Sequence, residues 1–297
     1  MGWRAILITL MLAGCAASGP SGPSRPAAPG LTPEQRQRLV DAERLYRSRS
    51  EEFVSVRDEL LGHPATTYWL AMFLIRDLVW ARDHRPVNDT SFLAMASGRN
   101  DPVEERALAQ IEAMGLKAVP CIVETLLRHP HGDRCALGAS TIARIGFEAI
   151  PALAPLLEDG DPKIRAHSVA ALAGMVSTPE VLACLEPFLE DPDFRVRVTA
   201  CRGFARGGVQ HAPRLYRMLR EDGDDYVCRQ LAPLLAKFKD RGAAVVLVEY
   251  LERCVDDGDV PGAKAAGDAL REISGRERVG SVEVWKAWLS GWSGGKI

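Results

Sequence analysis

The stretch DPKIRAHSVAALAGM (161–175) and the stretch DPDFRVRVTACRGFARGG (191–208) decide the fold. In each, Asp-Pro precedes a segment whose apolar residues recur every three or four positions, as on one face of a helix. Asp is a favoured N-cap because its carboxylate accepts an unpaired backbone N–H, and Pro is tolerated at the first helical position. The sequence therefore predicts two helices that begin alike, 30 residues apart.

The same unit recurs on both sides of this pair. Earlier copies begin at DPVEERALAQIEAMG (101–115) and HGDRCALGASTIARIG (131–146), and looser copies follow up to residue 275. A second apolar segment follows each of the four clear copies: AVPCIVETLLRH (118–129), AIPALAPLLED (149–159), EVLACLEPFLED (180–191) and APRLYRMLRED (212–222). Two short amphipathic helices cannot bury their apolar faces alone, so the copies are expected to stack into one continuous core.

This pattern resembles HEAT repeats, particularly the short, Ala-rich bacterial type. Arg165 and Arg195 stand four residues after Asp161 and Asp191, as in that family. The resemblance implies an all-α fold, an α-solenoid of stacked antiparallel helix pairs over residues 101–275. It also implies that the second helices line a concave face, and that caps and inter-repeat ladders account for these Asp and Arg residues.

Two flanking segments are expected to close the ends of the array. Residues 32–100 form an N-terminal helical cap and crossing loop, which includes the apolar stretch ATTYWLAMFLIRDLVWARD (65–83). Arg76 and Asp77 interrupt that stretch, which favours a core helix over a membrane span. Residues 276–297 form a C-terminal capping helix, with tryptophans on one face at Trp285, Trp288 and Trp292. An exposed docking surface is the alternative interpretation of this tryptophan stripe.

The N-terminus predicts export and attachment to a membrane. Arg4 precedes an apolar run of nine residues, too short for a membrane-spanning helix of about 20. The following Leu12-Ala13-Gly14-Cys15 resembles the bacterial lipobox, which implies a signal peptide over residues 1–14 and a lipid on the Cys15 thiol. Residues 15–31 then form a tether rich in Pro, Gly, Ser and Ala. Ala16 lacks the Asp that retains many such lipoproteins at an inner membrane, which favours an outer membrane. An ordinary signal peptide and a membrane-embedded anchor are the alternatives.

Composition and motifs argue against several kinds of chemistry. The 297 residues contain 37 Lys and Arg against 39 Asp and Glu, without the basic excess expected of a nucleic-acid-coating protein. The sequence lacks phosphate-binding, dinucleotide-binding and nucleophile-elbow motifs. The segment His129-Pro130-His131-Gly132-Asp133 is a weak metal candidate, since polar residues are expected in a turn. We therefore expect no catalysis, metal, cofactor or nucleic-acid partner.

Six cysteines remain after Cys15, without C-x-x-C or metal-ligand spacing: Cys121, Cys135, Cys184, Cys201, Cys228 and Cys254. All six lie in Ala- and Leu-rich helical segments, where a free thiol packs as a small hydrophobe. An exported chain permits disulfides, and position along the paired helices leaves Cys184–Cys201 and Cys228–Cys254 as the alternatives. We expect free thiols.

The outward positions of the second helices are the candidate protein-binding residues: Glu158, Glu186, Glu190, Arg214, Arg217 and Arg220. They grade from acidic to basic along the array, and residues 195–229 hold eight Arg against four acids. A merely solvated helix face is the alternative interpretation. The sequence thus predicts a membrane-anchored, non-catalytic scaffold that binds an unidentified envelope protein through its concave face. The second possibility is an enzyme accessory or cofactor-carrying protein with an unrecognised site.

Overall fold

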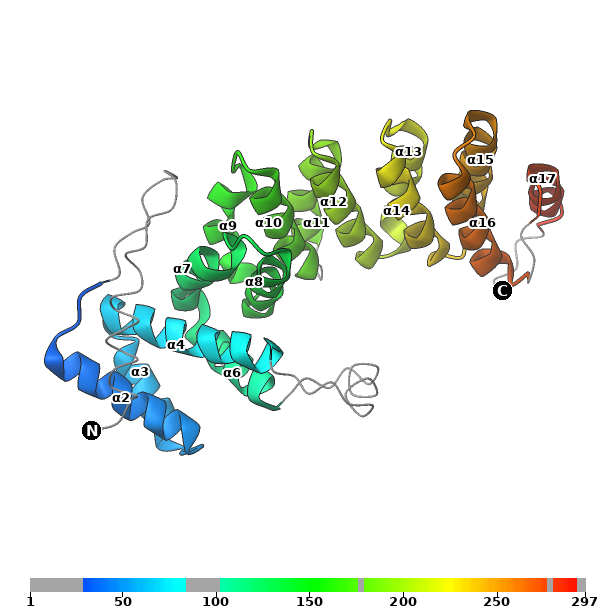
Figure 1. Cartoon of the computed structure of the whole chain (residues 1–297). Coiled ribbons are helices and arrows are strands. Elements are labelled where there is room, and N and C mark those ends of the chain that lie inside the picture. Colours follow the sequence, from blue (N-terminus) through cyan, green and yellow to red (C-terminus); the bar gives the residue numbers. More distant parts are fainter. Residues whose placement is uncertain (1–28, 84–101, 176–178, 277–279, 293–297) are drawn as a thin grey trace.

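The computed structural model describes residues 29–83, 102–175, 179–276 and 280–292, and this described part contains helices and no strand. The helices stack as antiparallel pairs into an elongated α-solenoid, which confirms the predicted fold class (Figure 1). The expected signal peptide and the lipidated Cys15 lie outside the described residues. Within the described chain, no single helix is long and apolar enough to cross a membrane, whereas one pair bent by 113°, Gly132–Ile145 with Phe147–Leu157, passes that test.

The array has two rows of helices. The first helices pack against one another in a row: α6 (Pro102–Met114), α8 (Gly132–Ile145), α10 (Pro162–Gly174), α12 (Phe194–Arg206), α14 (Asp225–Ala236) and α16 (Val260–Ser274). The second row is more irregular: η1 (Gly115–Ala118), α7 (Val119–Ile122), η2 (Val123–Leu127), η3 (Phe147–Ala149), α9 (Ile150–Leu157), α11 (Pro179–Leu185), η4 (Glu186–Glu190), η5 (Val209–His211), α13 (Ala212–Glu221) and α15 (Arg241–Asp257). Each first helix therefore contacts mainly its own partner and its two neighbours, as expected for a solenoid.

The core between the rows follows the predicted repeat, with one exception. Ile111, Ile142 and Leu172 occupy equivalent positions and are fully buried. In the fourth copy this position belongs to Phe204, which is also fully buried, rather than to Arg202 or Gly203, which the aligned Asp-Pro pairs predicted. A methyl group on Gly203 would lie 2.7 Å from a Leu185 methyl carbon and 2.9 Å from the Ala173 Cβ. Gly203 therefore allows α12 to approach its neighbours more closely than any larger residue would.

The predicted N-cap is right for α10 and wrong for α12. Asp161 caps α10 by accepting the backbone N–H of Lys163. The cap of α12 is Asp193 rather than Asp191, and its carboxylate accepts the backbone N–H of Arg195. Pro192 thus precedes the cap, whereas Pro162 follows its own cap. Aligning the repeats on their Asp-Pro pairs therefore placed the start of α12 two residues too early.

Three helices cap the N-terminal end: α2 (Pro33–Arg47), α3 (Glu52–Leu60) and α4 (Pro64–Asp83). The predicted start at Thr32 is a capping box, in which Thr32 and Gln35 satisfy each other's backbone N–H groups. Helix α4 buries Leu70, Leu74 and Leu78 and packs against α6. Helix α4 is therefore a core helix, as the two charged residues that interrupt its apolar stretch predicted.

At the other end, α17 (Val282–Ser290) packs against α15. Trp285 is completely buried, and the half-buried rings of Trp288 and Trp292 follow it in an edge-to-face series. Ring centroids are 5.5 Å and 4.7 Å apart along this series. Burial of this kind supports a capping role for the tryptophan stripe.

The cysteines in the described part are unpaired, and five of the six are buried. Cys184 is exposed on α11, so the expectation that every body cysteine packs as a small hydrophobe is wrong at this position. Its helix turns this side chain outward while Leu182 and Leu185 face the core.

Candidate protein-binding site

The six candidate binding residues lie on the second row: Glu158 after α9, Glu186 and Glu190 in η4, and Arg214, Arg217 and Arg220 in α13. Arg214 is half-buried, and the other five are exposed. On the opposite face of α13, Leu215, Met218 and Leu219 are buried. The sequence pattern therefore separated the outward face of this helix from its core face correctly.

The arginines of α13 do not form the open basic stripe that the sequence suggested. Arg214 forms an ion pair with Glu186 of the preceding repeat. Arg220 forms an ion pair with Glu249 of α15, the next helix of the second row, at 2.6 Å between Nε and a carboxylate oxygen. The hydrogen bonds that Arg220 donates to the Glu249 carboxylate raise the pKa of Arg220. These two arginines bridge neighbouring repeats, so charge reversal there would disturb packing between repeats as well as the surface.

Glu186, Glu190 and Arg217 line one groove between η4 and α13, of about 330 Å³. The other lining residues are Leu189, Arg197, Met218, Glu221, Asp222 and Gly223. Leu189 and Met218 are 5% and 9% exposed, so they form an apolar floor beneath charged walls. The structure therefore brings together three of the six predicted residues and leaves Glu158, Arg214 and Arg220 outside this groove.

The groove is acidic rather than basic. Four carboxylates and two guanidinium groups line it, which gives a net charge of −2. Arg197 donates to both oxygens of Asp222 at 2.8 and 3.0 Å, and this bonding raises the pKa of Arg197. Within the described part of the chain, Glu190 has no ion-pair partner. The groove is therefore suited to a cationic side chain above an apolar one.

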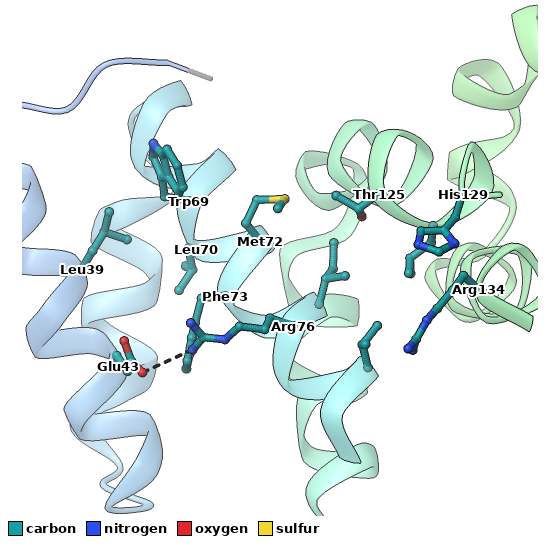
Figure 2. A pocket seen from close by; sticks show the side chains of 13 residues that line it. Leu39, Glu43, Trp69, Leu70, Met72, Phe73, Arg76, Thr125, His129 and Arg134 are labelled. Atoms are coloured by element: carbon teal, nitrogen blue, oxygen red, sulfur yellow. Dashed lines mark hydrogen bonds and ion pairs between the residues drawn. The ribbon is translucent and has the colours of Figure 1, made fainter. Parts of the chain in front are cut away.

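A larger cavity, of about 380 Å³, lies between the N-terminal cap and the first repeat (Figure 2). Its walls come from α2, α4, η2 and α8, and are mainly apolar: Leu39, Leu70, Met72, Phe73, Ile75, Val79 and Leu126. The ion pair between Glu43 and Arg76, at 3.3 Å, crosses one side of it. At the rim, the Trp69 indole donates to the Pro29 carbonyl at 3.0 Å, where the described chain begins.

This junction cavity was not foreseen because its walls are far apart in sequence. In the sequence, Leu39, Phe73 and Leu126 look like ordinary core positions, and each lies on a different helix. Leu39 and Phe73 are partly buried and Leu126 is fully buried, and the space between them depends on how α4 crosses the first repeat.

The turn that contains His129 and His131 carries a structural hydrogen-bond network. The backbone N–H of His131 donates to His129 Nδ1 at 3.1 Å, and Lys163 Nζ donates to the His129 carbonyl at 3.0 Å. Among the described residues, no group of three or more His, Cys, Asp or Glu side chains could hold a metal ion. These contacts connect the turn to the next repeat.

Comparison with known proteins agrees with this architecture. Residues 119–202 match the family model of HEAT repeats. This matched segment of the array is therefore similar to HEAT repeats. No curated protein is similar enough in sequence to count as a relative. Among solved structures, the complex of CpcE and CpcF of phycocyanin lyase from Nostoc sp. PCC7120 is similar at 18% identity, with a TM-score of 0.34. That match covers 91% of this chain and 98% of the other.

Proposed function

We propose that this HEAT-repeat protein is a membrane-anchored, non-catalytic scaffold that binds another protein of the cell envelope through its second-helix face. The anchor rests on the lipobox-like Leu12-Ala13-Gly14-Cys15, and the binding face rests on the groove between η4 and α13. A non-catalytic role is consistent with the groove's charged groups, which are mostly bonded to one another rather than arranged as a nucleophile with a base.

Glu190 is the observation that carries this proposal. Its exposed carboxylate stands beside the apolar floor of Leu189 and Met218 and has no ionic partner in the described chain. A Lys or Arg of a partner would pair with Glu190 while an apolar neighbour covers the floor. Apolar anchors provide most of the binding energy at protein interfaces, whereas complementary charges chiefly set the association rate and specificity.

Crosslinked pull-down of the lipidated protein from its own membranes tests the groove. Glu190→Lys should reduce recovery of the specific partner, and more strongly at low salt than at high salt. Glu158→Lys is the matched control, because Glu158 is also an exposed acid on the second row and does not line the groove. Equal recovery with both variants would contradict the proposed site.

The anchor has an independent test. Mass spectrometry of the mature N-terminus should find residue 15 as the first residue, with a lipid on its thiol. Membrane attachment then depends on that lipid, since each buried methylene contributes about 0.8 kcal/mol. A stable, unlipidated N-terminus elsewhere in the chain would contradict the anchor while leaving the groove untouched.

The junction cavity favours a second candidate function, as a carrier of an apolar cofactor or an accessory of an enzyme. Its volume of about 380 Å³ falls within the range of roughly 300–1,000 Å³ typical of small-molecule pockets. Native mass spectrometry of protein purified from its own membranes tests this function. A stoichiometric bound small molecule, lost in Phe73→Ala, would favour the carrier over the scaffold.

A further inference from the structure

A second charged cavity lies on the N-terminal cap, where α2, α4 and α6 meet. It has a volume of about 330 Å³ and is lined by Tyr46, Arg47, Arg49, Asp77, Pro102, Val103 and Arg106. Three guanidinium groups and one carboxylate give this lining a net charge of +2. The chain as a whole is slightly acidic, so this concentration of positive charge is local.

The three arginines differ in how far they are neutralised. Arg47 is paired with Glu43 and Asp77, at 3.1 and 3.3 Å. By contrast, Arg106 donates to the Tyr46 carbonyl and has no carboxylate partner in the described part of the chain. Its guanidinium lies 4.1 Å from the centroid of the Tyr46 ring, and this stacking limits its orientation.

Arg49 is the most available cation of the set. Its side chain is exposed and makes no hydrogen bond or ion pair among the described residues. It stands in the turn after α2 at φ 58°, a backbone conformation in which glycine is usually favoured. The turn thus presents an arginine to the cavity at a position that a glycine would occupy with less strain.

Tyr46 is buried beside these arginines. The residue is 2% exposed, and among the described residues its buried hydroxyl has no hydrogen-bond partner. Burial raises the pKa of Tyr46, Asp77 raises it further, and Arg106 and Arg47 lower it. The phenol therefore lies within electrostatic reach of three charged groups that line the cavity. Tyr46 therefore positions Arg106 through its ring and its backbone carbonyl.

We infer that this cavity is a binding site for a phosphate group, with Arg49 and Arg106 as the cationic ligands. Guanidinium groups bind phosphate oxygens in pairs, and two such groups without a carboxylate partner match the charge of a phosphate. The volume is near the lower limit for small-molecule pockets, so it suits a compact anion. The phosphate has two possible sources, the free ion and the head group of an anionic phospholipid.

Calorimetric titration of the full-length protein in a neutral detergent, at constant ionic strength, tests this site. The two probes are inorganic phosphate and glycerophosphoglycerol, the deacylated head group of phosphatidylglycerol. We expect saturable binding of one equivalent of at least one probe. Tighter binding of inorganic phosphate identifies the free ion as the source, and tighter binding of glycerophosphoglycerol identifies the lipid.

Single substitutions distinguish binding in this cavity from nonspecific attraction of an anion to surface arginines. Arg49→Ala should weaken binding about tenfold or more, because a hydrogen bond to a charged group typically contributes enough for such a change. Arg44→Ala is the matched control, since Arg44 is exposed on α2 and does not line the cavity. Absence of saturable binding of either probe, or equal affinities of Arg49→Ala and the unaltered protein, would overturn the inference. Arg106→Lys keeps the charge while losing the paired donors, so it should bind with intermediate affinity.

Discussion

Arg165 donates from Nε and Nη2 to the two carboxylate oxygens of Asp191, at 3.0 and 2.9 Å. Its third nitrogen, Nη1, donates to the Asp159 carbonyl at 2.9 Å in the turn before its own helix. One guanidinium therefore connects the start of one repeat to the start of the next. Arg197 repeats the arrangement with Asp222, so the array has a ladder of nearly buried ion pairs.

Removing one rung should lower stability. Arg165→Ala leaves Asp191, which is 8% exposed at its side chain, without its ionic partner. We expect a loss of about 1.5–3 kcal/mol, the range for hydrogen bonds to charged groups. Arg195→Ala is the control, because Arg195 is half exposed and bonds only within its own turn, to Asp193. Its loss should stay within about 0.5 kcal/mol. Urea unfolding followed by helical circular dichroism compares the two, and equal midpoints would show that the ladder contributes little.

Close packing at Gly203 leads to a second prediction. Gly203→Ala places a methyl group against Ala173 and Leu185, and overpacking of this kind typically costs about 1–3 kcal/mol. Gly132→Ala is the contrasting change, because no atom lies within 4 Å of the added methyl group at the start of α8. That variant should be neutral or slightly stabilising, as alanine is the better helix former. Thermal unfolding of both variants measures this difference in stability. A stabilised Gly203→Ala protein would mean that α12 can move away without cost.

The repeat pattern predicted the fold because each helix carries its own amphipathic stripe and its own turn. The ladder was partly visible as well, since Asp161 and Arg165 were excluded from the binding surface. Its register was misjudged because Asp191 and Asp193 are both Asp residues near one proline. In the pairs Asp191–Asp193 and Asp222–Asp224, the first Asp receives the arginine and the second caps the helix. This Asp-x-Asp spacing is the sequence signal that could have given the correct register of the repeat.

The candidate site was less predictable, because ionic pairing between repeats is not a property of one helix. The sequence identified Arg214 and Arg220 as outward residues, and they are outward. Their partners, Glu186 and Glu249, are 28 and 29 residues away in sequence. Stacking of the repeats brings these charges together, so the basic stripe is neutralised and an acidic groove remains. Hydrophobic periodicity predicts which side faces out, whereas the net charge there depends on this stacking.

Buried thiols should make stability fall at alkaline pH. Burial raises the pKa of both Cys121 and Cys201 from 9.0 to about 12. Above about pH 9 the unfolded chain loses these protons while the folded chain keeps them, so rising pH favours unfolding. Urea midpoints measured under reducing conditions should therefore decrease from pH 9 to pH 11. Cys201→Ala should reduce this decrease, and Cys184→Ala, at an exposed position, should leave it unchanged. A pH profile that is identical in all three proteins would contradict the assignment.

The central claim is that the groove between η4 and α13 contacts a protein partner. Site-specific photocrosslinking in intact membranes tests it most directly, with the photoreactive residue placed at Glu221. That side chain lines the groove and is 70% exposed. The control position is Arg195, which is 52% exposed on a first helix and does not line the groove. We predict one discrete crosslinked protein from position 221, absent from position 195 and lost when Glu190→Lys is added. The same crosslinks from both positions, or a position-221 crosslink that Glu190→Lys does not change, would contradict the account.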